Sequence, residues 1–582
     1  MSDIKSKSKS GKNPNFLKGA LILAVANFIV KIIGAMFKIP LFRLIGDDGS
    51  GYFNVAYQIY TFMFIVATAG FPVAVSKMVS ESLVNESESS ANRVFKVAFR
   101  FLAVVGLIGT LIMIVFSDAL ANLVAIKGSS VGIMVIAPSV FFVSLASAYR
   151  GYFQGRQNMY PTALSEVVES TTKMLVGLIA AGWIMGMTVD GSLGQAVDLA
   201  AHKIASAHIQ TIFASSGAIF GGTFGTLLSC LILSIIYIVH SRRKRELFRL
   251  PVKSNDRTIL KKLIMIAIPI TIGASVSSLT TLIDMATISR RLVINPDVFE
   301  RYSFMFAPGT DFYKKVIEEG WQGAELLSQK AATLYGMYTG KALTMFNLPL
   351  TLVVALGTSV VPAISAAVAA AKSREAKNIT EGTLRIAMLF AAPCAIGMAV
   401  LSEPILMLLF GTGNAKSVLS VLSISIIPVA IVQVSNSILQ SYGRVYKPVT
   451  HMIIGGAIKV VINFFCIPYL GIDGAPVGTF VCYLTIAVLN TISIIRTAKI
   501  DFKWDSFVIR PLLAALVMGV AAFGLLKVLP SGNLMCLIQI AICGIVYLIA
   551  ALAFGTIKKE DVLMLPSGEK IAELMLKYKL LK

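Results

Sequence analysis

The sequence predicts an all-α polytopic membrane protein with two parallel repeats of six transmembrane helices and two further C-terminal helices. Of its 582 residues, 56% are hydrophobic and 14% are charged, and the mean hydropathy is +0.79. A soluble domain has about a quarter of its residues charged. Apolar runs of about 20 residues recur along the whole chain, and each is long enough to cross a bilayer. Landmarks of the first half also return in the second.

At 1.5 Å per residue, each apolar run spans a hydrocarbon core of roughly 30 Å as a helix. Membrane β-barrels show short alternating segments instead, so the sequence excludes a barrel. We expect about fourteen spans. They are 17–41, 52–80, 94–116, 130–150, 161–183, 216–240, 260–289, 331–356, 384–402, 417–439, 449–468, 474–496, 511–529 and 533–555.

Landmarks that recur at a constant spacing indicate the repeat. Gly155-Arg156 precede Pro161 in the first half, and Gly443-Arg444 precede Pro448 in the second. Further pairs lie 285 to 290 residues apart: Pro72 and Pro362, Pro138 and Pro428, Ser117-Asp118 and Ser402-Glu403. Six helices return each copy to the same orientation, which predicts parallel repeats about an axis along the membrane normal. The interface between the copies is then the natural path for a substrate.

The positions of the basic residues predict the topology. The net charge is +22, and most Lys and Arg fall in inside loops and tails if the N-terminus is cytoplasmic. The expected parts are a cytoplasmic basic tail (1–16), an N-terminal lobe (17–240), a cytoplasmic basic linker (241–259), a C-terminal lobe (260–496), helices 13 and 14 (497–556) and a cytoplasmic tail (557–582). A nucleic-acid partner is not expected, because the chain has no folded basic domain.

Several kinds of chemistry are excluded. All six cysteines lie within predicted spans without a Cys-x-x-Cys pair, so neither a disulfide framework nor a zinc site is expected. No Walker-type loop is present, which excludes ATP hydrolysis by this chain as its power source. We therefore expect no enzymatic activity, no catalytic residues, no metal and no cofactor. The long external segment 292–330 is predicted to hold one or two short amphipathic helices, as a gate or as a lid-like insertion.

Four lysines lie deep within apolar spans: Lys31, Lys173, Lys341 and Lys459. Each is roughly 15 to 21 Å from the start of its helix, and an ionisable group near the bilayer centre costs at least about 2.5 kcal/mol. We predict that they line a cationic substrate-binding cavity, with internal ion pairing as the alternative. Lys38 lies near a helix end, where a long side chain reaches the interface.

Three acidic residues are candidate ion-coupling residues. Glu166 and Glu169 precede Lys173 by seven and four residues on one helix face, an arrangement that also neutralises a lysine. Asp284 lies near the outer end of the predicted span 260–289, with Arg290 and Arg291 beyond it, and is either a coupling-ion ligand or their interfacial partner. H⁺, Na⁺ and voltage alone all remain open as the driving force.

An excess of cavity lysines attracts anions, so the sequence predicts an anionic cargo. Phosphate groups suit lysine well, because its ammonium is a compact point charge without a fixed fork geometry.

Three strings resemble a known family: KGALILAVANFIVKIIGAMFKIPLFRLIGDDGSGYFNVAYQIY, ATAGFPVAVSKMVSE and NLPLTLVVALGTSVVPAIS. The chain resembles the SpoVB and YtgP branch of bacterial lipid-linked oligosaccharide flippases, relatives of the lipid II flippase MurJ in the MOP superfamily. The resemblance implies alternating access of two lobes, a cationic cavity for the lipid pyrophosphate and a lateral groove for the polyprenyl tail. By position, Lys31 and Lys341 match basic residues of that family.

The family resemblance leaves the saccharide open. MurJ-type proteins carry an arginine in the second helix, whereas residues 57–69 have no charge. Lipid II, a spore-cortex precursor and another polysaccharide unit all remain candidates. The alternative functions are a MATE-like multidrug or cation antiporter and a non-transporting scaffold for cell-wall synthesis. We expect a monomer in the bacterial cell membrane, with both termini cytoplasmic and with membrane lipids as neighbours.

Overall fold

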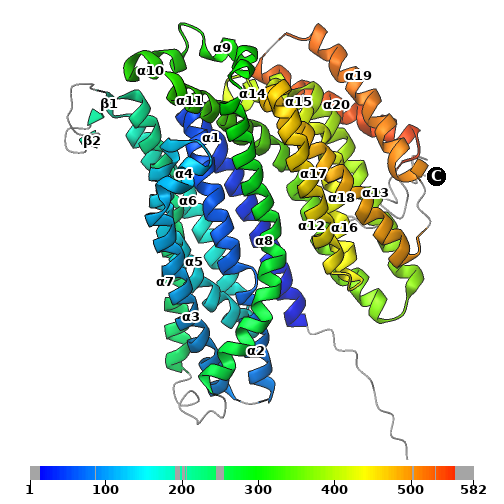
Figure 1. The fold of residues 1–582 in the computed structure, drawn as a ribbon. Helices are drawn as coiled ribbons and strands as arrows, with labels where there is room; N and C mark the ends of the chain where they lie inside the picture. Colours follow the sequence, from blue (N-terminus) through cyan, green and yellow to red (C-terminus); the bar gives the residue numbers. More distant parts are fainter. Residues whose placement is uncertain are drawn as a thin grey trace, which may run out of the picture.

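The computed structural model describes residues 14–85, 87–189, 197–198, 203–204, 206–243, 255–500, 504–530 and 532–556. The two predicted tails, apart from residues 14–16, and most of the predicted basic linker lie outside these ranges. The described chain is predominantly helical (Figure 1).

The helices of the first half are α1 (Pro14–Thr68), α2 (Phe71–Asn85), α3 (Glu88–Val115), α4 (Ser117–Leu123), α5 (Ser130–Gly155), α6 (Tyr160–Met185) and α7 (Ala207–Arg243), with the short η1 (Lys127–Ser129). The predicted span 17–41 and the first part of the predicted span 52–80 are continuous in α1, which bends at Gly46, while the rest of the span 52–80 falls in α2. Gly46 has φ 71° and ψ −171°, a backbone region that only glycine adopts readily.

Between α6 and α7 lie the short strands β1 (Thr188–Val189), β2 (Val197–Asp198) and β3 (Lys203–Ile204). Strand β3 pairs in parallel with β1 and in antiparallel fashion with β2.

The second half contains α8 (Asp256–Ile294), η3 (Pro296–Tyr302), α9 (Ser303–Phe306), α10 (Asp311–Glu319), α11 (Gly323–Gly336), η4 (Met337–Ala342), α12 (Leu343–Ala369), α13 (Ser373–Val400), α14 (Ser402–Phe410), α15 (Lys416–Ile424), α16 (Ile426–Ser441), α17 (Tyr446–Leu470), η5 (Gly471–Asp473), α18 (Gly474–Ala498), η6 (Asp505–Ile509), α19 (Arg510–Val528) and α20 (Asn533–Ala553). Segments η4 and η6 are π-helical.

The predicted repeat is confirmed by the order of the helices. In the first half, α3 is followed by the short α4 and then by α5, α6 and α7; in the second, α13 is followed by the short α14 and then by α15–α16, α17 and α18. Gly155 ends α5 and Gly443 follows α16, so both Gly-Arg landmarks occupy the same connection. The additional helices α19 and α20 complete the predicted fold class.

Nine described helical segments are long and apolar enough to cross a membrane, or ten if the bent pair α15–α16 forms one span. One of these segments, Tyr446–Ala498, contains both α17 and α18, while α1 and α8 are not among the nine. The chain is a multi-pass membrane protein, and the count of fourteen spans stays a prediction.

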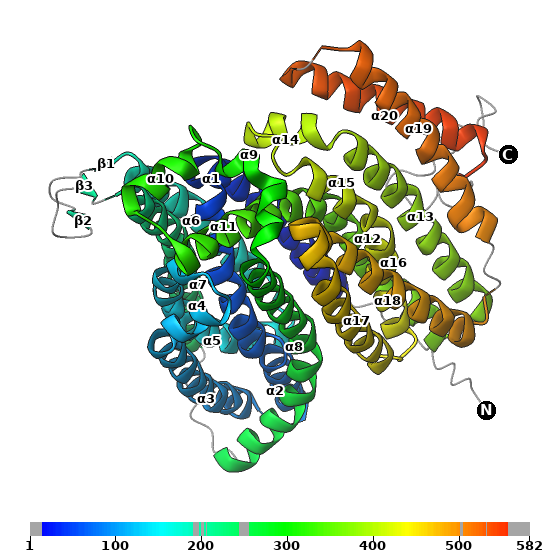
Figure 2. The same ribbon diagram turned by 45° about the horizontal axis from the view of Figure 1, so that its top comes forward.

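Apolar clusters divide the helices into groups. Side chains of α2, α3, α5 and α7 form one cluster, and the first turns of α8 join it through Ile259, Leu263 and Ala267. A separate cluster joins α13 to α19 and α20, and the Tyr547 hydroxyl donates a hydrogen bond to the Leu389 carbonyl at 2.6 Å. Accordingly, α19 and α20 lie on the flank of the molecule farthest from α3 (Figure 2).

The predicted short helices of segment 292–330 are present as η3, α9 and α10, together with the start of α11. The Thr310 hydroxyl caps α10 by accepting a hydrogen bond from the Tyr313 amide. These elements cover one end of the molecule, at the top of Figure 1, where helices of the first and second halves of the chain meet. We call this end the loop end.

Candidate functional site

A hollow extends from the interior of the first-half helices α1, α5, α6 and α7 to the second-half helices α12, α16 and α18. It consists of two adjoining cavities of about 480 and 380 Å³ that share Val30, Tyr57, Ser170 and Lys173. Helices α1 and α6 contribute to both cavities, while α12, α16 and α18 complete the larger one. We call the two together the central cavity.

The larger part of the central cavity is cationic. Lys31, Lys38 and Lys173 line it, and its described lining includes no Asp or Glu. The Lys173 ammonium lies 3.9 Å from the centroid of the Tyr57 ring, a cation–π contact. Since the opposite wall offers only neutral polar groups such as Asn347, all the positive charge comes from α1 and α6.

The smaller part of the central cavity holds a buried ion pair. Arg150 of α5 lies 2.8 Å from Glu169 of α6, and its guanidinium also donates to the hydroxyls of Ser165 and Ser229. Glu169 therefore pairs with Arg150 rather than with Lys173, which corrects the interpretation drawn from helical spacing. Glu166 lines the same cavity, and one of its carboxylate oxygens is buried without a hydrogen-bond partner among the described residues.

The four deep lysines do not converge on one cavity. Lys31 and Lys173 lie together, whereas Lys341 lines a different cavity at the loop end. Lys459 lies on α17 with its side-chain stem against Gly478 of α18. Asp284 is a residue of α8, and its side chain lies outside the described part of the chain.

Sequence reasoning missed Lys38, which was expected to reach an interface and instead lines the central cavity. It follows Lys31 by seven residues. Two helical turns separate such residues, and both lie on the same face. That spacing was the available signal.

At the loop end, polar contacts join the bend of α1 to the second half of the chain. The Lys341 ammonium lies 2.6 Å from a carboxylate oxygen of Asp47. It also donates hydrogen bonds to the Thr412 hydroxyl at 2.7 Å and the Asn414 side-chain carbonyl at 3.0 Å. Asn414 in turn donates to the second oxygen of Asp47 at 2.5 Å. The side chains of Lys341 and Asp47 are only 5% and 12% exposed.

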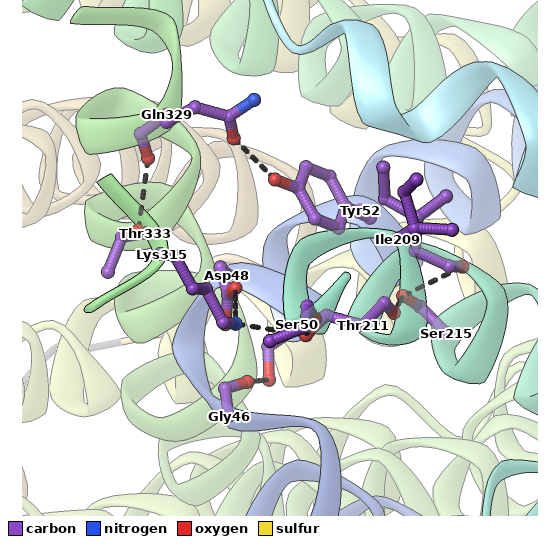
Figure 3. Close-up of polar contacts among 12 residues, drawn as sticks. Gly46, Asp48, Ser50, Tyr52, Ile209, Thr211, Ser215, Lys315, Gln329 and Thr333 are labelled. Carbon is purple, nitrogen blue, oxygen red and sulfur yellow. Dashed lines mark hydrogen bonds and ion pairs between the residues drawn. The ribbon is translucent and has the colours of Figure 1, made fainter. Parts of the chain in front are cut away.

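The adjacent carboxylate, Asp48, is held from the other side. Lys315 of α10 lies 2.5 Å from it and donates a hydrogen bond to Thr211 of α7 at 2.9 Å (Figure 3). The Tyr52 hydroxyl also donates to the side chain of Gln329 on α11 (Figure 3). We call Asp47, Asp48, Lys315, Lys341 and Asn414 the interlobe lock. Segment 292–330 thus contacts the bend of α1 and the start of α7 through Lys315.

Glycines allow the backbones to approach closely within the lock. A Cβ atom on Gly336 would lie 1.7 Å from the Asp47 carbonyl oxygen, and one on Gly340 would lie 2.8 Å from the Ser50 side chain. Small residues at helix interfaces permit such contact in membranes. Lys341 belongs to the π-helical η4, and π-helical turns are frequent at functional sites.

Beyond the lock lies a cavity of about 1310 Å³, which we call the loop-end chamber. Lock residues line it together with parts of η3, α9, α10, α14 and α15. Basic residues such as Arg301 and Lys416 alternate with acidic ones such as Glu403 and Asp473. Burial, and after it the charge of Asp473, raises the pKa of the Tyr302 phenol, which donates a hydrogen bond to Asp473 at 2.9 Å.

No group of three or more His, Cys, Asp or Glu side chains placed to hold a metal ion occurs within the described ranges.

Two family models match the chain. The model described as "Polysaccharide biosynthesis protein" matches residues 16–368, which is more than half of the chain. The model described as "Lipid II flippase MurJ" matches residues 328–542. Together they cover both repeats and the start of α20.

Curated relatives from Bacillus subtilis (strain 168) align along nearly the full length. The chain is 24% identical to "Uncharacterized membrane protein YabM", with 96% of each chain covered. It is 22% identical to "Stage V sporulation protein B", with 95% of this chain and 98% of the relative covered. It is 25% identical to "Lipid II flippase MurJ", with 84% of each covered.

Solved structures share the fold. "Lipid II flippase MurJ, inward closed conformation" aligns with a TM-score of 0.65 at 15% identity, over 92% of this chain and 98% of that one. An inward-facing multidrug resistance MATE family transporter of the MOP superfamily aligns with a TM-score of 0.58 at 15% identity, over 82% and 100%. The chain has the fold of these transporters, and it belongs to the polysaccharide biosynthesis protein family.

Proposed function

We propose that the protein is a flippase that moves an anionic lipid-linked oligosaccharide from the inner to the outer leaflet by alternating access. Lipid II or a related polysaccharide precursor is the proposed cargo. The observation that carries the proposal is the larger part of the central cavity, where Lys31, Lys38 and Lys173 face no carboxylate among the described lining residues. Family membership and the named function of the MurJ relative support it.

The proposed cycle begins with the loop end closed and facing outward. The three lysines attract the pyrophosphate from the cytoplasmic side, because cavity cations focus anions and bind phosphate oxygens by charge-assisted hydrogen bonds. The neutral polar side chains of Asn347, Thr351 and Gln433 on the opposite wall offer hydrogen bonds to sugar hydroxyls. The loop end then opens and the cytoplasmic end closes. The polyprenyl tail stays in the bilayer throughout.

Two energy sources fit this arrangement. An inside-negative potential favours outward movement of a negative headgroup by about 2.3 kcal/mol per charge per 100 mV. Glu166, which lies in the central cavity with one carboxylate oxygen lacking a hydrogen bond, is the candidate for coupling to H⁺ or Na⁺. Glu169 already holds Arg150, so it is the weaker candidate.

The antiporter and scaffold alternatives are less well supported. A cavity for cationic drugs needs free carboxylates, whereas Glu169 is paired, Glu166 is confined to the smaller part, and the charged residues that line the larger part are all lysines. A scaffold gains nothing from three lysines gathered in a cavity part whose described lining holds no carboxylate, since their desolvation in a membrane interior is costly.

Translocation by the purified protein in proteoliposomes tests the proposal. Fluorescent lipid II is compared with a neutral glycolipid that has the same polyprenyl chain and no pyrophosphate. We expect transfer of lipid II between leaflets and no transfer of the neutral lipid above protein-free vesicles. Equal transfer of both lipids, or of neither, contradicts the proposal.

A further inference from the structure

We propose that Lys341, Thr412 and Asn414 form an anion-binding site whose occupant in this structure is the Asp47 carboxylate. A phosphate-bearing headgroup then opens the interlobe lock by displacing Asp47. The identity of the anion rests on the proposed function, while the site itself rests on the geometry of the lock.

The contacts of Asp47 are those of a bound anion. One carboxylate oxygen lies against the Lys341 ammonium and the other accepts from the Asn414 amide. The Thr412 hydroxyl and the Asn414 side-chain carbonyl accept hydrogen bonds from the same ammonium and hold it in place. A phosphate oxygen uses the same ammonium and amide donors, and charge-assisted bonds of this kind are the strong ones. The site is therefore already built for an anion and temporarily filled by one.

The position of the site suits a headgroup that leaves the central cavity. Thr344 lines the central cavity one helical turn after Lys341 on the continuous η4–α12 rod. Lys341, Thr412 and Asn414 themselves line the loop-end chamber. An anion that passes from the central cavity to the chamber thus meets the lock on its way.

Self-occupancy gives the lock its selectivity. When the carboxylate of Asp47 fills the site, an external anion binds only to the fraction of molecules in which the site is free. Its apparent affinity is the intrinsic affinity multiplied by that fraction. A neutral lipid has no group that competes with Asp47 for Lys341, so it leaves the lock closed. Once the headgroup has left, Asp47 returns to Lys341 and closes the lock again.

A purely structural ion pair makes a different prediction. Removing either partner of a buried pair leaves an uncompensated charge and weakens the fold in both cases. In a self-occupied anion site, the two removals have opposite effects on anion binding. Asp47→Asn vacates the site, whereas Lys341→Gln destroys it.

The experiment measures binding of inorganic pyrophosphate and of geranylgeranyl pyrophosphate to the full-length protein in nanodiscs by calorimetry. We expect Asp47→Asn to bind both about 5- to 150-fold more tightly than wild type, the usual range of a coupling free energy. Lys341→Gln should bind them more weakly than wild type. Asp48→Asn is the matched control: it removes the same charge one residue away, from the carboxylate that pairs with Lys315, and should change affinity less than Asp47→Asn.

Spin-label distances give a second readout. Labels at Lys127 and Met407, on opposite halves of the chain, are introduced into a background without the six native cysteines. Geranylgeranyl pyrophosphate should lengthen the distance in wild type and geranylgeraniol should not. Asp47→Asn should show the long distance without any ligand. Should Asp47→Asn fail to fold, Asp47→Ser replaces it, because serine also removes the charge and keeps a small polar side chain that can hydrogen-bond to Asn414.

An affinity of the folded Asp47 variant equal to or weaker than that of wild type overturns the inference. The outcome is separable from the proposed function. If Asp47→Asn tightens pyrophosphate binding but the wild type moves no lipid II in proteoliposomes, the anion site stands and the flippase proposal falls. If lipid II moves while the Asp47 variant binds no more tightly, the flippase proposal stands and this inference falls.

Discussion

The interlobe lock and the central cavity use buried charge in opposite ways. Asp47 and Asp48 in the lock each have a lysine partner within 2.6 Å. In the larger part of the central cavity, Lys31, Lys38 and Lys173 meet no carboxylate among the described lining residues. We infer that a charge paired within the chain closes a contact, whereas a charge without a partner among the described residues is available to a ligand. In this proposal lysine has two roles, and its ion-pair partner distinguishes them.

The largest effect should follow from removing charge in the cavity. The double variant Lys31→Gln with Lys173→Gln removes two cations, each worth about 1.5–3 kcal/mol as a partner for phosphate. Transport should fall by at least about tenfold, while the free energy of unfolding changes little, because no ion pair among the described residues is lost and the relief of lysine desolvation offsets the lost Lys173–Tyr57 contact. Complementation of a flippase-depleted strain at matched surface expression measures the effect.

Lys96→Gln is the control for this variant, because Lys96 is exposed on α3. It should support normal growth. Wild-type growth with both cavity lysines replaced would show that the cavity lysines do not bind the transported lipid.

The second largest effect is expected when a larger side chain replaces a glycine in the lock. Gly336→Ala places a Cβ atom 1.7 Å from the Asp47 carbonyl oxygen, so the backbones must separate at a cost of about 1–3 kcal/mol. We expect a lower melting temperature and a longer loop-end distance between the spin labels. Gly544→Ala on α20 meets no atom within 4 Å and should be neutral or stabilising. Identical behaviour of the two variants would argue against a tight lock.

A smaller effect is expected at α10, where two adjacent lysines differ in environment. Lys315 is 15% exposed and paired with Asp48, whereas Lys314 is 65% exposed and paired with Asp311 on the surface. Lys315→Ala should lower the local opening free energy of α10 by about 1–3 kcal/mol, and Lys314→Ala by at most about 1 kcal/mol. Hydrogen exchange of the α10 amides compares them, and equal protection in both variants would exclude α10 from the lock.

The smallest effect concerns α20, outside both charge sites. Tyr547→Phe removes the hydrogen bond to the Leu389 carbonyl, which should cost about 0.5–1.5 kcal/mol of stability and leave transport unchanged. Thermal unfolding and the proteoliposome assay check the two parts. Loss of transport in this variant would mean that α20 takes part in the moving lobes.

The sequence predicted the repeat and the two embedded lysines Lys31 and Lys173, because both depend on patterns along the chain. Periodic apolar runs locate spans, and recurring glycine and proline landmarks align the two copies. Depth within a span, however, gives only the height of a side chain and not the face it occupies. For this reason Lys341 and Lys459 were predicted to share a cavity with Lys31, and the structure separates them.

Ion-pair partners were the other part that the sequence did not reveal. Helical spacing favoured Glu169 with Lys173, but Arg150 from the neighbouring α5 reaches Glu169 at 2.8 Å. The Asp47–Lys341 pair joins residues from opposite halves of the chain. Such partners depend on how helices pack, and a single sequence contains no direct record of that packing.

Access to the central cavity from each side of the membrane distinguishes a closing lock from a ligand-binding cavity. A cysteine replaces Gly34, which lines the cavity and has no atom within 4 Å of its Cβ position, in a background without other reactive cysteines. A membrane-impermeant maleimide should label it in wild type from the cytoplasmic side alone, and in Asp47→Asn from the outer side as well. Two results would contradict the proposed roles of the closing lock and the ligand-binding cavity. One is labelling of the wild type from the outer side, and the other is an Asp47→Asn variant that the maleimide does not label from the outer side.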